Sequence, residues 1–305
     1  MKLFPSISFL GILTLFACNS AVNDNKTAAD SLATNNDSVA AHVADTIAPD
    51  IEPVSLFKPL IKKIKKEYYY KASSKREVYT TAKYYIEWPT EAPGYDILPL
   101  QNILIETLFD DKYPNINTAM RKAGLSWFVS CGGDLTWTEV PERGKTEDGE
   151  PSPDDEMYFW GEPEYNAEIH YKGVDNDHHF AVFDLDMYGY NGGGTGAGVI
   201  TYNRTVYYLY NEQRLMTIDD IVDAKGKNVI IRKLNNHPIG IENYSCMNGT
   251  PISALSPVFH INKGIIYFTY PKYELACGAD GPVTLGVRLS SIKDHLTEYG
   301  STFLQ

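Results

Sequence analysis

Residues 180–190 alternate between apolar and polar side chains, and this alternation constrains the fold more than any other feature of the chain. Successive side chains of a β-strand point to opposite faces, so this segment is predicted to be a strand with one buried and one hydrated face. The apolar set, which we expect to face a core, is Phe183, Leu185 and Met187. The polar set on the other face is Asp184, Asp186, Tyr188 and Tyr190.

Further strands are predicted where β-branched and aromatic residues cluster between turn residues. The segments are 78–88 (ended by Pro89), 167–172, 199–210, 214–217, 265–270 and 282–289. The segment 60–70 fits both a helical and a strand period, and its state stays open.

Helices are predicted from apolar residues at helical spacing. The segments are 99–111, with Pro99 at the first helical position, 115–123, 219–222, 229–236 and 291–299. Helices and strands follow one another without regular alternation. This favours an α+β fold of two small packed subdomains, with mixed or antiparallel sheets and flanking helices.

The first seventeen residues have the length and composition of a signal peptide, and their apolar run is too short for a permanent membrane span. The run ends in Leu15-Phe16-Ala17-Cys18, which resembles the lipobox of bacterial lipoproteins. The resemblance implies cleavage before Cys18 and acyl chains on its sulfur. Residues 18–50 are polar and lack aromatic residues, which is typical of a disordered tether.

The rest of the chain is predicted to form two domains, 51–160 and 161–305. The formal net charge of the whole chain is -12. An acidic surface argues against nucleic acid as a partner and suits a cationic ligand.

Three cysteines follow the tether: Cys131, Cys246 and Cys277. An odd number allows at most one internal disulfide. Cys246 and Cys277 are the preferred pair because they flank the same predicted hairpin. No two cysteines have the C-x-x-C spacing of a zinc site, so we expect no metal there.

Several motifs in the second half occur in a recognisable order. A glycine-rich segment, 190–196, contains Gly192, Gly193, Thr195 and Gly196. It precedes the segments 215–221 and 259–268 and the run Tyr270-Pro271-Lys272-Tyr273, which is followed by Gly278. This order resembles domain of unknown function 3298 (DUF3298). Residues 84–89 and the predicted helix at 99–111 resemble the smaller, PdaC-type (DUF4163-like) domain that usually precedes it.

The resemblance implies a paired α+β scaffold that binds a ligand in the cell envelope. DUF3298 occurs in the lysozyme-sensing anti-sigma factor RsiV and before the catalytic domain of a peptidoglycan deacetylase. The family motif usually reads Tyr-x-Gly-Gly-Ala-His, whereas Gly194 and Thr195 occupy the last two positions here. A role that depends on that histidine is therefore not expected.

The sequence contains no clear catalytic or cofactor motif. The glycine-rich segment lacks the lysine and the helix of a phosphate-binding loop, so we expect no nucleotide cofactor. His178 and His179 are adjacent and would point to opposite faces of a strand, which disfavours a shared metal ion. Asp184 and Asp186 leave open a cell-wall polysaccharide hydrolase or deacetylase as the alternative.

We therefore expect a binding or sensing module of the cell envelope that is anchored to a membrane by its lipid. The expected membrane is the outer membrane, with the protein on the periplasmic or the surface side. Candidate ligands are a basic protein such as lysozyme, or peptidoglycan. The candidate binding residues are Asp184, Asp186, Tyr188 and Tyr190, because carboxylates steer cationic ligands and tyrosines supply contact area.

Overall fold

The computed structural model describes residues 56–73, 78–131, 135–144, 162–192 and 199–304. These residues belong to one compact unit that spans Pro53–Gln305. The predicted signal peptide, Cys18 and the tether lie outside the described residues.

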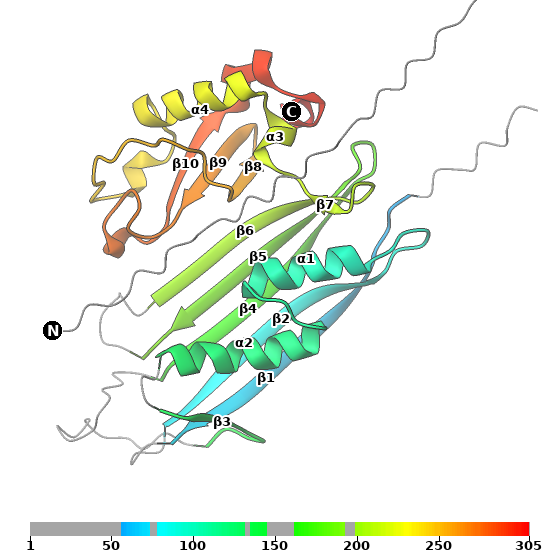
Figure 1. Ribbon diagram of the computed structural model, residues 1–305, viewed down its shortest axis with the longest axis vertical. Helices are drawn as coiled ribbons and strands as arrows, with labels where there is room; N and C mark the ends of the chain where they lie inside the picture. The colour runs from blue at the N-terminus through cyan, green and yellow to red at the C-terminus, as the bar shows by residue number, and fades with distance from the viewer. Residues whose placement is uncertain (1–55, 74–77, 132–134, 145–161, 193–198, 305) are drawn as a thin grey trace, which may run out of the picture. The chain divides into compact units, whose positions relative to one another are not determined.

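A seven-stranded sheet forms most of the first part of the unit (Figure 1). Its strand order is β3-β1-β2-β4-β5-β6-β7, and neighbours are antiparallel except for the parallel pair β2 and β4. The strands are β1 (Leu60–Ala72), β2 (Val78–Glu91), β3 (Trp137–Val140), β4 (Glu164–Asp175), β5 (Phe180–Tyr190), β6 (Val199–Leu209) and β7 (Arg214–Leu215).

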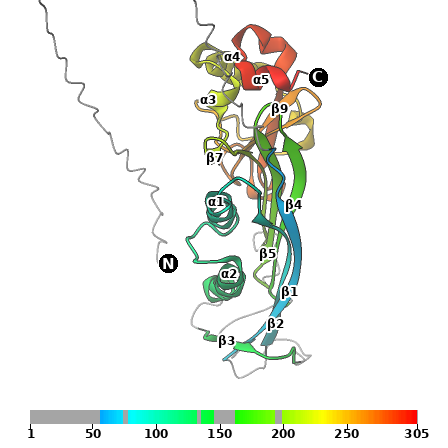
Figure 2. The ribbon, with the colours of Figure 1, turned by 90° about the vertical axis from the view of Figure 1, so that its right-hand side faces the viewer.

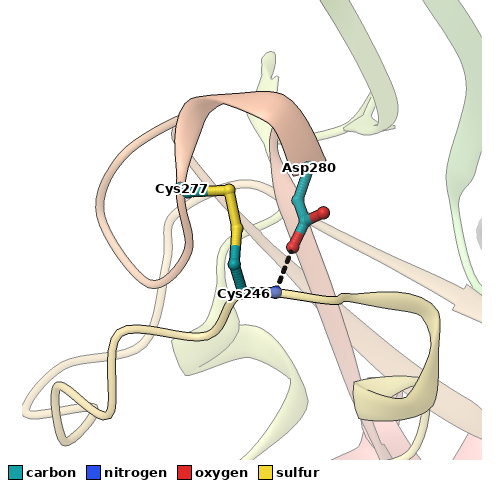
Figure 3. A group of neighbouring side chains, drawn as sticks. All are labelled: Cys246, Cys277 and Asp280. Atoms are coloured by element: carbon teal, nitrogen blue, oxygen red, sulfur yellow. Dashed lines mark hydrogen bonds between the residues drawn. A yellow bond between two sulfur atoms is a disulfide. The ribbon is translucent and has the colours of Figure 1, made fainter.

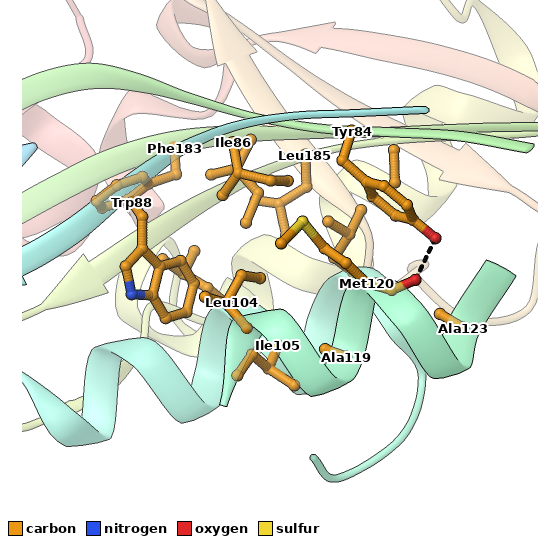
Figure 4. Close-up of a cluster of buried hydrophobic side chains, with 14 of the residues drawn as sticks. Tyr84, Ile86, Trp88, Leu104, Ile105, Ala119, Met120, Ala123, Phe183 and Leu185 are labelled. Carbon is orange, nitrogen blue, oxygen red and sulfur yellow. Dashed lines mark hydrogen bonds between the residues drawn. The ribbon is translucent and has the colours of Figure 1, made fainter. Parts of the chain in front are cut away.

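Helices α1 (Leu98–Phe109) and α2 (Ile116–Cys131) cover one face of this sheet (Figure 2). The first large core lies between them and the sheet, because alternate strand residues point toward the helices (Figure 4). Tyr84 reaches α2 and donates a hydrogen bond from its hydroxyl to the carbonyl of Met120. Gly124 lets α2 approach the sheet closely, because a Cβ there would lie 2.8 Å from the Cβ of Ala82.

A three-stranded antiparallel sheet, in the order β10-β9-β8, forms the rest of the unit. Its strands are β8 (Phe259–Asn262), β9 (Ile265–Tyr270) and β10 (Val283–Arg288). The α-helices of this part are α3 (Ile218–Ile221), α4 (Ala224–Asn236) and α5 (Glu298–Thr302). Short 3-10 helices span Ile241–Asn243, Gly278–Asp280 and Leu289–His295.

A second core joins the small sheet to one end of the large sheet. Phe180 of β5 and Tyr207 of β6 belong to it. The ring of Tyr207 stacks on Phe259 with centroids 6.0 Å apart, and its hydroxyl accepts a hydrogen bond of 2.9 Å from the backbone N–H of Ile261. These contacts cover the β5–β6 end of the sheet face that α1 and α2 leave free.

The predicted α+β class with mixed and antiparallel sheets is confirmed, and so are the strands at 180–190 and 265–270. The segment 60–70, left open by its period, is part of a strand. The sheet runs across the predicted domain boundary near residue 160, because β2 pairs with β4. The boundary itself lies outside the described residues.

Three expected elements differ from the structure. Pro89 does not end β2, because it lies within the strand opposite Ile61 beside a break in register, where a missing N–H is tolerated. The expected helix at 115–123 continues to Cys131. The expected helix at 291–299 is instead a 3-10 helix and α5, separated by the non-helical Leu296 and Thr297.

Candidate functional site: the open face of the large sheet

The candidate site is the face of the large sheet that points away from α1 and α2, which we call the open face. In Figure 2 both helices lie on one side of the sheet, and no described element covers the other side along β1 and β4. Residues on this face align in rows, because paired positions on neighbouring strands project to the same side.

Two of these rows cross five strands. The Asp186 row consists of Lys65, Tyr85, Glu168, Asp186 and Asn203, one residue each from β1, β2, β4, β5 and β6. The Tyr188 row, in the same strand order, consists of Glu67, Lys83, Asn166, Tyr188 and Thr201. The residues on β1, β2 and β4 were not among the predicted binding residues, although the alternation of Lys83, Tyr85 and Glu87 with buried apolar residues in β2 was a usable signal.

All four predicted binding residues lie on this face. Phe183 and Leu185 are fully buried, whereas Asp184, Asp186, Tyr188 and Tyr190 are half-buried on the opposite side of β5. The predicted alternation of β5 is therefore confirmed. Whether these residues bind a ligand stays a prediction.

Asp184 is engaged by its neighbours. Its carboxylate accepts a hydrogen bond of 2.7 Å from the hydroxyl of Thr205 on β6. It also forms an ion pair of 3.3 Å with Lys172 of β4. Two partners fix its orientation on an open surface.

Asp186 lies in a less favourable environment. Burial raises the pKa of its carboxyl above the usual value, and the carboxylates of Asp184 and Glu168 add to the increase. Glu168 is its direct cross-strand partner, and like charges at opposite positions destabilise a sheet. The imidazole of His170 lies 2.7 Å from Glu168 and relieves part of this repulsion when it is protonated.

The β1 and β2 side of the open face carries lysines and aromatic residues. Lys63 forms an ion pair of 3.1 Å with Glu87, which also accepts a hydrogen bond of 2.9 Å from the backbone N–H of Tyr171. The hydrogen bond with Glu87 raises the pKa of Lys63. The ammonium of Lys65 lies 5.3 Å from the centre of the Tyr85 ring, a cation–π distance.

A shallow groove of about 620 Å³ crosses the open face over β1, β2 and β4. Its lining includes Lys65, Glu67, Lys83, Tyr85, Asn166 and Glu168. These residues come from the Asp186 and Tyr188 rows. The groove therefore borders the predicted binding residues of β5.

The predicted disulfide joins Cys246 and Cys277, with Cα atoms 5.6 Å apart (Figure 3). Asp280 lies beside them and accepts hydrogen bonds from the backbone N–H groups of Ser245 and Cys246, both at 2.9 Å. The hydrogen bond from Cys246 is the main reason that the pKa of Asp280 is lowered. These three side chains are close enough for a metal site, but sulfurs joined in a disulfide are not thiolate ligands.

The described residues singled out in the DUF3298-like motifs lie at the end of a strand or between strands. Tyr270 ends β9, is buried and donates a hydrogen bond of 3.3 Å to the carbonyl of Ala254. After Pro271, Tyr273 adopts a φ of 73°, and its ring occupies the space that a Cβ of Gly278 would need. Gly192 has a φ of 79° and follows β5. Gly193, Thr195 and Gly196 lie outside the described residues.

The two adjacent histidines occupy the β4–β5 turn. A ring nitrogen of His178 lies 2.8 Å from the carboxylate of Asp175, and one of His179 lies 3.2 Å from the hydroxyl of Tyr210. They therefore contact different partners.

The fold is similar to that of a solved DUF3298 protein. The crystal structure of a DUF3298 family member from Bacteroides fragilis matches with a TM-score of 0.55 and 14% identity, over 80% of this chain and 96% of that one. A DUF3298 family protein from Pseudomonas aeruginosa matches with a TM-score of 0.42 and 11% identity, over 79% and 95%. No family model matches the sequence, and no curated protein matches it. At 14% identity, the first similarity supports the DUF3298 fold expected from the motifs, and the fold alone.

Proposed function

We propose that this protein is a lipid-anchored binding or sensing module of the cell envelope, and that the open face binds its ligand. The observation behind this proposal is the grouping of Asp184, Asp186, Tyr188 and Tyr190 with Glu168 on a part of the sheet that α1 and α2 do not cover. Carboxylates steer a cationic ligand toward the face, and tyrosines provide contact area at a low entropic cost.

The ligand that we propose is a basic protein of the lysozyme type, or peptidoglycan. The formal charge of -12 favours association with a cationic partner. Lysozyme recognition is known for a protein that carries a DUF3298 domain, and it comes to this chain only by that resemblance.

The anchor is proposed from the sequence around Cys18, which lies outside the described residues. None of the described helices has both the length and the apolar character needed to cross a membrane. An acylated Cys18 would supply the attachment, because two or more acyl chains hold a protein stably on a bilayer.

We favour binding over hydrolysis because of the surroundings of the two aspartates. Asp184 is held by Thr205 and Lys172. The groove over β1, β2 and β4 is not lined by Asp184 or Asp186. A glycosidase needs two carboxyl groups on either side of a bound sugar, whereas Asp184 and Asp186 project from the same side of one strand.

The test is retention of the protein on immobilised lysozyme and on insoluble peptidoglycan, at low and high salt. The variant Asp184→Asn/Asp186→Asn removes two charges from the open face and keeps the side-chain shapes. The matched control, Glu242→Gln/Asp294→Asn, removes two charges from exposed positions elsewhere.

We expect the wild-type protein and the control to be retained on at least one matrix at low salt, with weaker retention at high salt. The open-face variant should be retained less on that matrix. Equal retention of the two variants, or no retention of the wild-type protein on either matrix, would rule out the proposed binding face.

A further inference from the structure

Three charged side chains of the open face stand out because the other charged residues of their rows have partners. Within the described part of the chain, no hydrogen bond or ion pair engages the side chain of Lys65, Lys83 or Asp186. By contrast, Glu67 accepts a hydrogen bond of 2.8 Å from the hydroxyl of Tyr69, and Glu168 lies 2.7 Å from His170.

The unpaired charges are separated by sign across the sheet. Lys65 of β1 and Lys83 of β2 border the groove, and Asp186 of β5 lies beyond Glu168 in the same row as Lys65. Neighbouring strands are about 4.8 Å apart, so two strand spacings place Lys83 roughly 10 Å from Asp186 across the strands. Three spacings place Lys65 roughly 14 Å from Asp186.

We infer that the groove binds a short extended peptide that carries a free carboxylate at one end and a free amine at the other. The peptide lies across the strands, with its carboxylate between Lys65 and Lys83 and its ammonium against Asp186 and Glu168. This inference rests on the proposed function, because it names the ligand of the same face.

The dimensions of the site agree with this ligand. An extended peptide advances about 3.3 to 3.6 Å per residue, so three or four residues span the roughly 10 to 14 Å from the two lysines to Asp186. A groove of about 620 Å³ lies within the range of small-ligand sites.

Polar side chains beside the acidic end also suit a peptide. Asn166 and Tyr188 lie next to each other in the Tyr188 row, and their amide and hydroxyl groups can form hydrogen bonds with peptide groups. An ammonium group would relieve the repulsion between Glu168 and Asp186. A uniformly anionic ligand would meet these two carboxylates, and a uniformly cationic ligand would meet the two lysines, so a ligand with both charges fits best.

The probe is the peptide N-acetyl-Lys-Ala-Ala-Ala, which has a side-chain amine near one end and a carboxylate at the other. One derivative has an amidated C-terminus, and a second has an acetylated lysine side chain. Binding is followed by NMR titration of isotope-labelled protein. We expect each derivative to bind about 2- to 5-fold more weakly than the parent, which corresponds to the loss of one exposed charge pair.

The protein variants identify which end of the peptide meets which residues. Lys65→Met/Lys83→Met should abolish the preference for the free carboxylate and keep the preference for the amine. Asp186→Asn should do the reverse. The controls Lys122→Met/Lys293→Met and Asp294→Asn change exposed residues elsewhere and should keep both preferences.

The inference is wrong if the parent peptide does not bind, if all three peptides bind equally, or if the controls alter the preferences as much as the site variants do. These failures are distinguishable from failure of the proposed function. Retention on lysozyme or peptidoglycan that depends on Asp184 and Asp186 would then persist, and only the peptide ligand would be rejected.

Discussion

The disulfide between Cys246 and Cys277 should contribute a large share of the stability of the C-terminal part. The cysteines are 31 residues apart, and the chain-entropy model gives about 3 to 4 kcal/mol for a loop of that length. The backbone is already paired beside the bond, since the N–H of Cys277 donates to the carbonyl of Cys246 over 3.1 Å. The bond therefore joins two segments that hydrogen bonds hold together in the fold.

Replacing both cysteines with alanine should lower the thermal midpoint by about 10 °C, because 1 kcal/mol corresponds to about 2 to 4 °C in a unit of this size. Thermal unfolding is measured by near-UV circular dichroism for the wild-type protein, with and without reductant, and for Cys246→Ala/Cys277→Ala. Cys131→Ala is the control, because it leaves the disulfide intact.

The expected result is that the double variant and the reduced wild-type protein unfold at similar, lower temperatures, whereas Cys131→Ala behaves like the oxidised protein. If the oxidised wild-type protein and the double variant unfold within about 2 °C of each other, the loop-closure argument fails for this bond.

Three further outcomes are expected. Phe57→Ala should lower the free energy of unfolding by about 3 to 5 kcal/mol in denaturant titrations, because Phe57 is 1% exposed and stacks on Tyr210 with ring centroids 4.5 Å apart. A loss below about 1 kcal/mol would contradict this. Asp186→Asn should raise the thermal midpoint at neutral pH and have little effect at acidic pH. The folded state raises the pKa of Asp186, so the ionised carboxylate destabilises the fold once the pH exceeds that pKa, and a lower midpoint of the variant at neutral pH would contradict this. Cys18→Ala should move the protein from the membrane fraction to the soluble fraction on cell fractionation, with an unchanged distribution as the contrary result.

Local patterns in the sequence were sufficient for the elements that depend on few distant contacts. The alternation of residues 180–190 predicted both the ends and the two faces of β5, because the pleat alone decides which side chains point together. The clusters of β-branched and aromatic residues likewise predicted strands at 199–210 and 214–217, which contain β6 and β7. The expectation that Pro89 ends β2 was wrong, because proline is excluded only where the ladder needs its N–H, and β2 has a break in register beside it.

The candidate site depends on pairings that no local pattern contains. The sequence by itself determined that Asp184, Asp186, Tyr188 and Tyr190 share one face of a strand. Only the tertiary structure decided that β4 pairs with β2, although two helices and a strand separate them in the chain. This pairing sets Glu168 beside Tyr85 and places Asp186 in one row with Lys65. The physical reason is that the register between distant strands is set by packing of their buried residues against α1 and α2, and the partners on the open face follow from that packing.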